Sequence, residues 1–437
     1  MKQKHPILKL LCPFLALLLL LQTPISVSAK TFPKSWPQAP EISNETGILM
    51  EAATGQVLFD KGMDEVRYPA STTKVMTALL ILENIEDLSE VITFTDVITP
   101  DLEPGNSTID AKVGEQLTVE QCLYAIMLAS ANEVCTQMAV RVAGSVSNFT
   151  AMMNERAAEL GCENTHFVNA NGLPDPNHYT TAHDLAKILA AAVANEDFCK
   201  ISGASAYTIP PTNMTASARN LSNTNALIAE GDSHYEGVLA GKTGHTEAAR
   251  NTLVTAARRD NMTLICVVMR SEGKDRFTDT TALFDYGFNN FHMEPVYWMD
   301  EENPAGYAVL PKDVSPGSLA IKEEDSPDLR TRTYSYQGSE ILKVYASLPM
   351  EVKSQNHLRY VSGKNQEYPK FRSVLLLSSP VMMVILAVLV VILIVVIVRA
   401  VLDSKSQKEA KKKSELKIAK QKMQHLHTVS SNLSGTL

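Results

Sequence analysis

Residues 68–79 read Tyr68-Pro69-Ala70-Ser71-Thr72-Thr73-Lys74-Val75-Met76-Thr77-Ala78-Leu79. Apolar residues fill most positions from Val75 to Leu82, which predicts a buried helix over Ser71–Glu83. Ser71 and Lys74 are three residues apart, so their side chains share one helical face. A nucleophilic serine needs a base within hydrogen-bond reach, and a neutral lysine supplies one. Taken alone, the same spacing also fits a helix N-cap followed by a solvated lysine.

Two further short segments carry compatible chemistry. Ser130-Ala131-Asn132 lies at a predicted break between helices within Val119–Val142, where a hydroxyl can relay a proton and an amide can hold a substrate carbonyl. Lys242-Thr243-Gly244 follows a strand-like segment. On an edge strand, Gly244 lets backbone approach a substrate, and Lys242 and Thr243 can bind a carboxylate. Alone, each segment is also explained by an ordinary capping or strand-to-turn sequence.

In this order and spacing, the three segments form the signature of serine penicillin-recognising enzymes. The chain resembles the low-molecular-weight D-alanyl-D-alanine carboxypeptidases, peptidase family S11, over about Glu41–His292. Further segments that resemble the family are Val113–Thr118, Asn164–Asn169, Asp175–Thr181, Gly241–Thr246, Arg276-Phe277 and Asp285–Phe288.

The resemblance implies an enzyme that removes the terminal D-alanine from peptidoglycan stem pentapeptides. The reaction passes through an acyl-enzyme on Ser71, and penicillins acylate the same serine and inhibit it. Lys74 is the implied general base, with a pKa lowered by the like charge of Lys242. Ser130 is the implied proton relay, and Asn132 binds the substrate amide.

The resemblance also implies how the substrate is held. Backbone N–H groups of Ser71 and His245 form the oxyanion hole, and Thr243 and Arg276 bind the terminal carboxylate. The implied substrate-binding residues are therefore Asn132, Lys242, Thr243, Gly244, His245 and Arg276. Two departures affect substrate preference and rate: Ala249 stands where the family often has glycine, and Pro104–Ala111 varies the glycine-rich loop before Val113.

The order of elements is strands, then helices, then strands, with a hairpin predicted around Asp260-Asn261. This order predicts an α+β fold in which helices cover an antiparallel sheet whose first and last strands meet, the serine β-lactamase/DD-peptidase-like domain that the resemblance implies. A small all-β domain and one C-terminal transmembrane helix follow. The predicted boundaries are signal peptide 1–29, linker 30–40, catalytic domain 41–292, β-rich domain 293–365, transmembrane helix 374–398 and basic cytoplasmic tail 399–437.

The two ends of the chain predict its location. Three lysines, an apolar run from Leu10 to Leu21 and Val27-Ser28-Ala29 are typical of a cleaved signal peptide; a retained anchor is the alternative. About 25 apolar residues over Val374–Val398 suffice to cross a bilayer, and the lysine-rich segment after them marks the cytoplasmic side. We expect a single-pass membrane protein with its catalytic domain extracellular. The net charge of −8 argues against nucleic-acid binding.

Cysteine usage argues against a disulfide framework and leaves a single disulfide open, and histidine usage predicts no metal site. The expected mature chain keeps five cysteines, at positions 122, 135, 162, 199 and 266, an odd number without a CxxC pair. His166, His178 and His183 lack the spacing of metal ligands, so structural roles are expected. We predict no cofactor.

Three other functions share parts of this pattern. A serine β-lactamase has the same fold and nucleophile but needs a carboxylate for fast deacylation, for which Glu133 and Glu163 are candidates by type. An inactive, membrane-tethered peptidoglycan-binding protein is a second alternative, disfavoured because the catalytic residue types are intact. A transpeptidase is a third, disfavoured because Arg276 favours a free terminal carboxylate.

Overall fold

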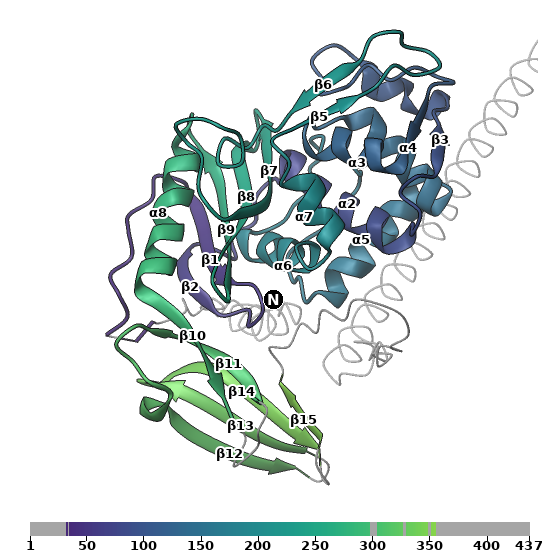
Figure 1. The fold of residues 1–437 in the computed structure, drawn as a ribbon. Coiled ribbons are helices and arrows are strands. Elements are labelled where there is room, and N and C mark those ends of the chain that lie inside the picture. The colour runs from purple at the N-terminus through teal and green to yellow at the C-terminus, as the bar shows by residue number, and fades with distance from the viewer. Residues whose placement is uncertain (1–31, 34, 298–303, 327–328, 348–350, 355–437) are drawn as a thin grey trace, which may run out of the picture. The chain divides into compact units, whose positions relative to one another are not determined.

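The computed structural model describes residues 32–33, 35–297, 304–326, 329–347 and 351–354 (Figure 1). Within these ranges, no helix combines the length and hydropathy needed to cross a bilayer. The predicted signal peptide, transmembrane helix and cytoplasmic tail lie outside the described residues.

A five-stranded antiparallel sheet forms the centre of the catalytic region, in the order β2-β1-β9-β8-β7. The first strand of the chain pairs with a late one, Ile48 lying opposite Val267, as the sequence predicted. β8 and β9 form the predicted hairpin, and Asp260 in its turn has a φ of 55°. The strands are β1 (Thr46–Glu51), β2 (Val57–Lys61), β7 (Val238–Thr246), β8 (Arg250–Arg259) and β9 (Met262–Ser271).

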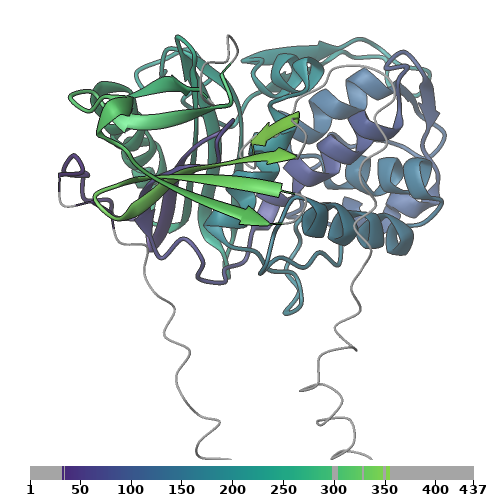
Figure 2. The same cartoon turned by 90° about the horizontal axis from the view of Figure 1, so that it is seen from below.

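Helices cover both faces of this sheet, with a helical cluster on one side and α8 on the other (Figures 1 and 2). The predicted break at Ser130–Asn132 separates α3 from α4. The helical elements are η1 (Ala70–Thr73), α2 (Lys74–Asn84), η2 (Asp96–Leu102), α3 (Val119–Met127), α4 (Asn132–Ala143), α5 (Val146–Glu159), α6 (Ala182–Ala192), α7 (Glu196–Ser202) and α8 (Asp275–Asn290). Two short hairpins border the cluster, β3 (Val91–Thr93) with β4 (Gln116–Thr118), and β5 (Ala206–Ile209) with β6 (Arg219–Ser222).

Alternation along β9 divides the core into two layers, because successive side chains of a strand point to opposite faces. Odd-numbered residues pack with the helical cluster, and even-numbered residues pack with α8 and its neighbours. The first set is Ile265, Val267 and Met269, and the second is Leu264, Cys266 and Val268.

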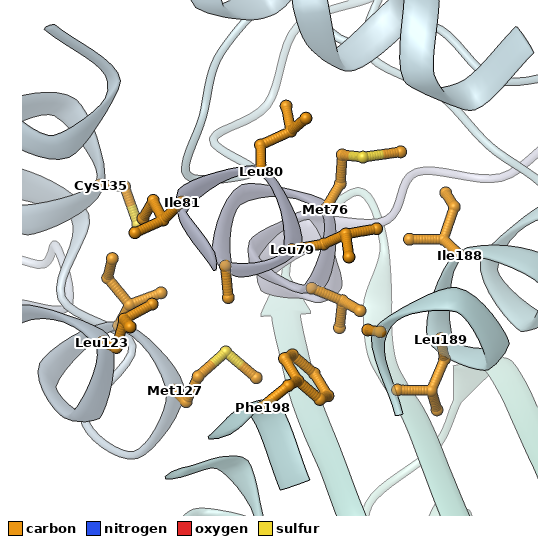
Figure 3. Packing of buried hydrophobic residues seen from close by; sticks show 14 of the residues in the cluster. Met76, Leu79, Leu80, Ile81, Leu123, Met127, Cys135, Ile188, Leu189 and Phe198 are labelled. Carbon is orange, nitrogen blue, oxygen red and sulfur yellow. The ribbon is translucent and has the colours of Figure 1, made fainter. Parts of the chain in front are cut away.

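α2 lies inside the helical cluster and contacts α3, α4, α5, α6 and α7 (Figure 3). Every residue from Lys74 to Ile81 is buried, as the broad apolar pattern predicted. The buried hydrophobic side chains packed around α2 include Met76 and Leu79 of α2 itself, Met127 of α3 and Phe198 of α7. A lysine at the first position of such a helix therefore lies in a low-dielectric interior.

The predicted all-β region is seen in part, over the described residues up to 354, and has its own buried core, which includes Val296, Leu310 and Leu342. One pair of strands is β10 (Phe291–Val296) with β11 (Gly306–Pro311). A four-stranded antiparallel sheet comprises β12 (Ala320–Ser326), β13 (Leu329–Tyr336), β14 (Ser339–Ser347) and β15 (Glu351–Ser354), with a short 3₁₀ turn η3 (Pro316–Ser318) before it.

The described part of the predicted linker, residues 32–33 and 35–40, makes specific contacts. The Trp36 ring lies 5.0 Å from the Phe291 ring, and its Nε1 donates to the Leu58 carbonyl (3.3 Å). Ser35 Oγ is 2.8 Å from Tyr336 Oη of the β-rich region.

Candidate active site

Ser71 lies on a tight turn rather than in the α-helix itself. It belongs to the 3₁₀ helix η1, and Ala70 before it has a φ of 51°. The Pro69 carbonyl fixes this turn by accepting hydrogen bonds from Thr72 Oγ1 (2.7 Å) and from Thr252 Oγ1 of β8 (3.0 Å). Such a left-handed conformation costs energy for a residue with a Cβ, so the surrounding contacts hold the turn and Ser71 in place.

Two glycines pack against this turn without room for a side chain. A Cβ on Gly172, which has a φ of 88°, would lie 1.9 Å from the Ala70 carbonyl oxygen. A Cβ on Gly244 would lie 2.3 Å from Thr252 Oγ1 and 2.9 Å from the Pro69 oxygen. The sequence predicted that Gly244 lets backbone approach a substrate, and that role stays a prediction; in the structure the Ser71 turn packs against this glycine.

Lys74 directs its ammonium group at Ser71. Nζ donates to Ser71 Oγ (3.1 Å), Asn132 Oδ1 (2.8 Å) and the Asn171 carbonyl (2.5 Å). The side chain is fully buried, and burial lowers the pKa of Lys74 because the charged form loses hydration. The predicted lowering is therefore confirmed, but burial is its main cause and not the charge of Lys242.

Ser130 and Asn132 lie at the break between α3 and α4, and Asn132 contacts the same ammonium. Ser130 has a φ of 61°, and its buried Oγ has no hydrogen-bond partner among the described residues. Asn132 offers Oδ1 to Lys74, and its backbone N–H donates to the Ser107 carbonyl (2.8 Å). A buried hydroxyl without a partner is available to a bound substrate or water.

Lys242 and Thr243 lie on β7, which is the edge strand that the sequence predicted. Lys242 is 1% exposed, and its Nζ donates to the Thr243 carbonyl (3.1 Å). Burial, reinforced by the nearby Lys74, lowers the pKa of Lys242 to about 7. Thr243 is more accessible than Lys242, and its Oγ1 shares a hydrogen bond with Thr224 Oγ1 (2.6 Å).

His245 and Arg276 lie further from the buried centre. His245 is exposed on β7 opposite Asn251. Arg276, at the start of α8, donates from Nη1 to the Gly273 carbonyl (2.5 Å), and its guanidinium lies 4.5 Å from the centre of the Phe277 ring. No carboxylate in the described ranges pairs with this guanidinium. The oxyanion-hole role of the Ser71 and His245 N–H groups stays a prediction.

The structure adds residues that the sequence reasoning missed. The Asn171 carbonyl accepts from Lys74, and Asp101 Oδ1 accepts from Asn171 Nδ2 (3.0 Å). Thr224 contacts Thr243 through its hydroxyl. Asn171-Gly172 lies one residue beyond the family-like segment Asn164–Asn169, which was the available signal for Asn171. Asp101 and Thr224 carry no local sequence signal.

The histidines have structural roles, as predicted. His178 Nδ1 accepts from the Val168 N–H (3.2 Å), so the imidazole carries its proton on Nε2 and donates to Thr73 Oγ1 (2.8 Å). Burial lowers the pKa of His178 to about 4, which keeps the ring neutral. His166 bonds the Asn177 carbonyl, and His183 pairs with Asp64. All five described cysteines are free thiols.

The sequence profile of peptidase family S11, described as D-alanyl-D-alanine carboxypeptidase, matches residues 34–273. The chain belongs to the D-alanyl-D-alanine carboxypeptidase family. The resemblance inferred from the sequence is therefore confirmed, whereas the catalytic roles of Ser71 and Lys74 stay predictions.

The chain is also similar in sequence to individual D-alanyl-D-alanine carboxypeptidases. DacF of Bacillus subtilis is 35% identical over 262 residues, which cover 59% of this chain and 66% of DacF. The carboxypeptidase of Streptomyces sp. K15 is 33% identical, with 57% of this chain and 88% of that protein covered. DacA of Escherichia coli is 31% identical over 331 residues, which cover 70% of this chain and 77% of DacA.

The fold is also similar to solved structures of related proteins. The Streptomyces K15 DD-transpeptidase superposes with a TM-score of 0.54 at 32% identity, covering 58% of this chain and 99% of that one. Penicillin binding protein 6B from Escherichia coli superposes with a TM-score of 0.60 at 25% identity, covering 72% of this chain and 98% of that one.

Proposed function

We propose that this serine D-Ala-D-Ala carboxypeptidase works through an acyl-enzyme on Ser71, with Lys74 as the general base. The observation that carries the proposal is the 3.1 Å contact between Lys74 Nζ and Ser71 Oγ inside a buried site. A lysine accepts a proton only when it is neutral, and its burial favours the neutral form.

In the acylation step, Lys74 Nζ takes the proton of Ser71 Oγ while Oγ bonds to the carbonyl carbon of the penultimate D-alanine. The peptide C–N bond then breaks, and the proton passes from Lys74 through the Ser130 hydroxyl to the departing D-alanine amine. The unpartnered Ser130 Oγ supports this relay. In the second step, water attacks the acyl carbon and gives a proton to the neutral Lys74 Nζ, the bond to Ser71 Oγ breaks, and Oγ takes that proton from Nζ.

Specificity for a free carboxylate is proposed to come from Thr243 and Arg276. Thr243 presents an accessible hydroxyl on the edge strand. Arg276 keeps its charge without a carboxylate partner among the described residues, and its Nε is also unbonded. A carboxylate satisfies such a guanidinium through charge-assisted hydrogen bonds.

The decisive experiment measures D-alanine release from a peptide that ends in D-Ala-D-Ala, using the purified full-length chain. Ser71→Ala is expected to abolish release and the covalent penicillin adduct, whereas the exposed Ser222→Ala should retain both. Release by the Ser71→Ala variant would overturn the assignment of the nucleophile.

The same assay separates the alternatives. Penicillin turnover without D-alanine release indicates a β-lactamase, and transfer to an added amine indicates a transpeptidase, the activity named for the Streptomyces K15 structure. Absence of every reaction indicates a binding protein. The β-lactamase candidates are poorly placed: Glu163 is exposed, and the buried Glu133 accepts the Ile109 N–H (2.8 Å).

We propose peptidoglycan stem peptides as substrates, β-lactams as covalent inhibitors, and membrane anchoring through residues 374–398. The name of penicillin binding protein 6B supports the inhibitor class. The apolar run over Val374–Val398 and the lysines after it support the anchor and its orientation. Protease treatment of intact cells should cleave the catalytic domain and spare the tail; the reverse pattern would contradict this orientation.

A further inference from the structure

Asp101 is a buried carboxylate close to the catalytic base. It lies in η2, which packs against α4, and it is 7% exposed. Its Oδ1 accepts from Asn171 Nδ2 (3.0 Å), and its backbone carbonyl accepts from Asn106 Nδ2 (3.2 Å). Within the described ranges, no lysine, arginine or histidine forms a salt bridge with it. A buried acid without an ion-pair partner is costly, so its bond to Asn171 calls for an explanation.

Asn171 links this acid to Lys74. Its carbonyl accepts from Lys74 Nζ at 2.5 Å, the shortest of the three hydrogen bonds that the ammonium makes. Its side-chain amide is held at both ends, because Nδ2 donates to Asp101 and Oδ1 accepts from the Leu173 N–H (3.1 Å). Gly172, the next residue, packs against the Ala70 carbonyl of the Ser71 turn.

We infer that Asp101 and Asn171 form a positioning pair for the general base: the carboxylate fixes the Asn171 side chain, and the Asn171 carbonyl then fixes Lys74 Nζ in reach of Ser71 Oγ. The inference rests on the proposed function of Ser71 and Lys74. Among the described residues, Ser71 Oγ is hydrogen-bonded by Lys74 and by neither residue of the pair, so both act through Lys74.

The charges around Lys74 give this pair an electrostatic signature. Burial opposes the charged ammonium of Lys74, whereas the carboxylates of Asp101 in η2 and Glu133 in α4 favour it. The Cys135 thiol of α4 is neutral at ordinary pH, because burial raises its pKa to about 12. Among the described residues, Lys242 of β7 and the neutral His178 also interact electrostatically with the base. Removing the Asp101 charge lowers the pKa of Lys74 further, so the neutral base persists to lower pH. The acid limb of the pH–rate profile should therefore move to lower pH.

The test measures the rate of penicillin acylation of Ser71 against pH in the full-length chain. Asp101→Ala and Asn171→Ala should each slow acylation by about tenfold to 100-fold, the effect of a misplaced catalytic group. The double variant should be no slower than the worse single one, because both changes break one chain of contacts. Asp101→Asn keeps a hydrogen-bond acceptor and should retain most of the rate, with its acid limb moved down by roughly 0.5–1 pH unit.

Asp96→Ala is the matched control, because Asp96 is an exposed carboxylate of the same 3₁₀ helix. It should leave the rate and the profile unchanged. Wild-type rates and profiles in Asp101→Ala and Asp101→Asn, or fully additive losses in the double variant, would overturn the inference. If Asp101→Ala fails to fold, the acylation rates and pH profiles of Asp101→Asn and Asn171→Ala still test whether the pair positions Lys74. A wild-type chain that penicillin does not acylate would overturn the proposed function, and this inference with it.

Discussion

Gly172 shows how closely single residues control the Ser71 turn. Gly172→Ala places a Cβ 1.9 Å from the Ala70 carbonyl oxygen at a φ of 88°, so the turn must move. We expect a loss of about 3 kcal/mol or more in the free energy of unfolding and loss of penicillin acylation. Urea unfolding and acylation rates measure the two effects.

Gly144→Ala is the control for that substitution. Gly144 ends α4 with a φ of 76°, and a Cβ there meets no atom within 4 Å. The Gly144→Ala variant should therefore lose only the free energy of unfolding that a Cβ at a positive φ costs, about 1 kcal/mol. It should keep the full rate of penicillin acylation. If Gly172→Ala and Gly144→Ala lose equal amounts of stability and acylation rate, the contact with Ala70 is unimportant.

Lys242 makes stability depend on pH. Its pKa is about 7 in the folded chain against an ordinary value of 10.5, so between these pH values the unfolded chain binds more protons. The free energy of unfolding should rise with pH across this window, by up to about 1.4 kcal/mol per pH unit. Lys242→Met removes this dependence and should unfold at higher urea concentration at pH 7, while losing activity.

Urea unfolding at about pH 7, 8 and 9 compares Lys242→Met with the wild type. The stability difference should shrink as the pH rises. The exposed Lys274→Met should follow the wild-type curve at each pH. Parallel curves for Lys242→Met and the wild type would contradict a lowered pKa.

At the scale of elements, the sequence predicted most of what local pattern determines. The β8–β9 hairpin, the break at Ser130 and the buried α2 follow from turn residues and apolar periodicity, and all are present. Ser71, Lys74 and Lys242 were recognisable because each stands in a short segment with its own chemistry. The Asp101–Asn171 contact was not, because it joins residues 70 positions apart through tertiary packing alone.

A buried ion pair joins elements that no strand pairing connects. Glu115, just before β4, is fully buried and accepts from Arg219 Nη2 of β6 (2.8 and 2.9 Å) and from Thr212 Oγ1 (2.5 Å). Burial alone would raise the pKa of Glu115, but these bonds and the Lys112 N–H together lower it. Arg219→Met leaves the carboxylate without its cation and should cost about 3–5 kcal/mol at neutral pH.

That loss should diminish as the pH falls through the carboxylate range, because a protonated Glu115 no longer needs the cation. Chemical unfolding at about pH 7 and pH 4 tests this. Arg141→Met removes an exposed ion pair with Glu90 and should cost less than about 1 kcal/mol. A loss at Arg219 as small as the one at Arg141 would refute the role of the buried pair.

At the scale of the whole molecule, Trp36 packs against both the sheet–α8 core and the core of the β-rich region. Trp36→Ala should lower the free energy of unfolding by about 2–3 kcal/mol, less than for a fully buried tryptophan. Tyr297→Ala, at a 45% exposed aromatic residue, should cost less than about 0.5 kcal/mol. Calorimetry measures both, and a Trp36→Ala chain as stable as Tyr297→Ala would show that the contact contributes little.

Lys74, the proposed general base, is the first residue of a helix that contacts five others, and this placement limits which sequence changes the chain can accept during evolution. Substitutions in α2 or at Gly172 or Gly244 disturb the core packing and the active site together. Few substitutions at these positions should therefore leave both stability and activity unchanged. The accessible residues Thr224, Thr243 and Arg276 can vary without opening the core. We expect evolutionary changes in substrate preference and in inhibitor resistance to occur at these three accessible residues. The buried Ser71 turn should stay unchanged.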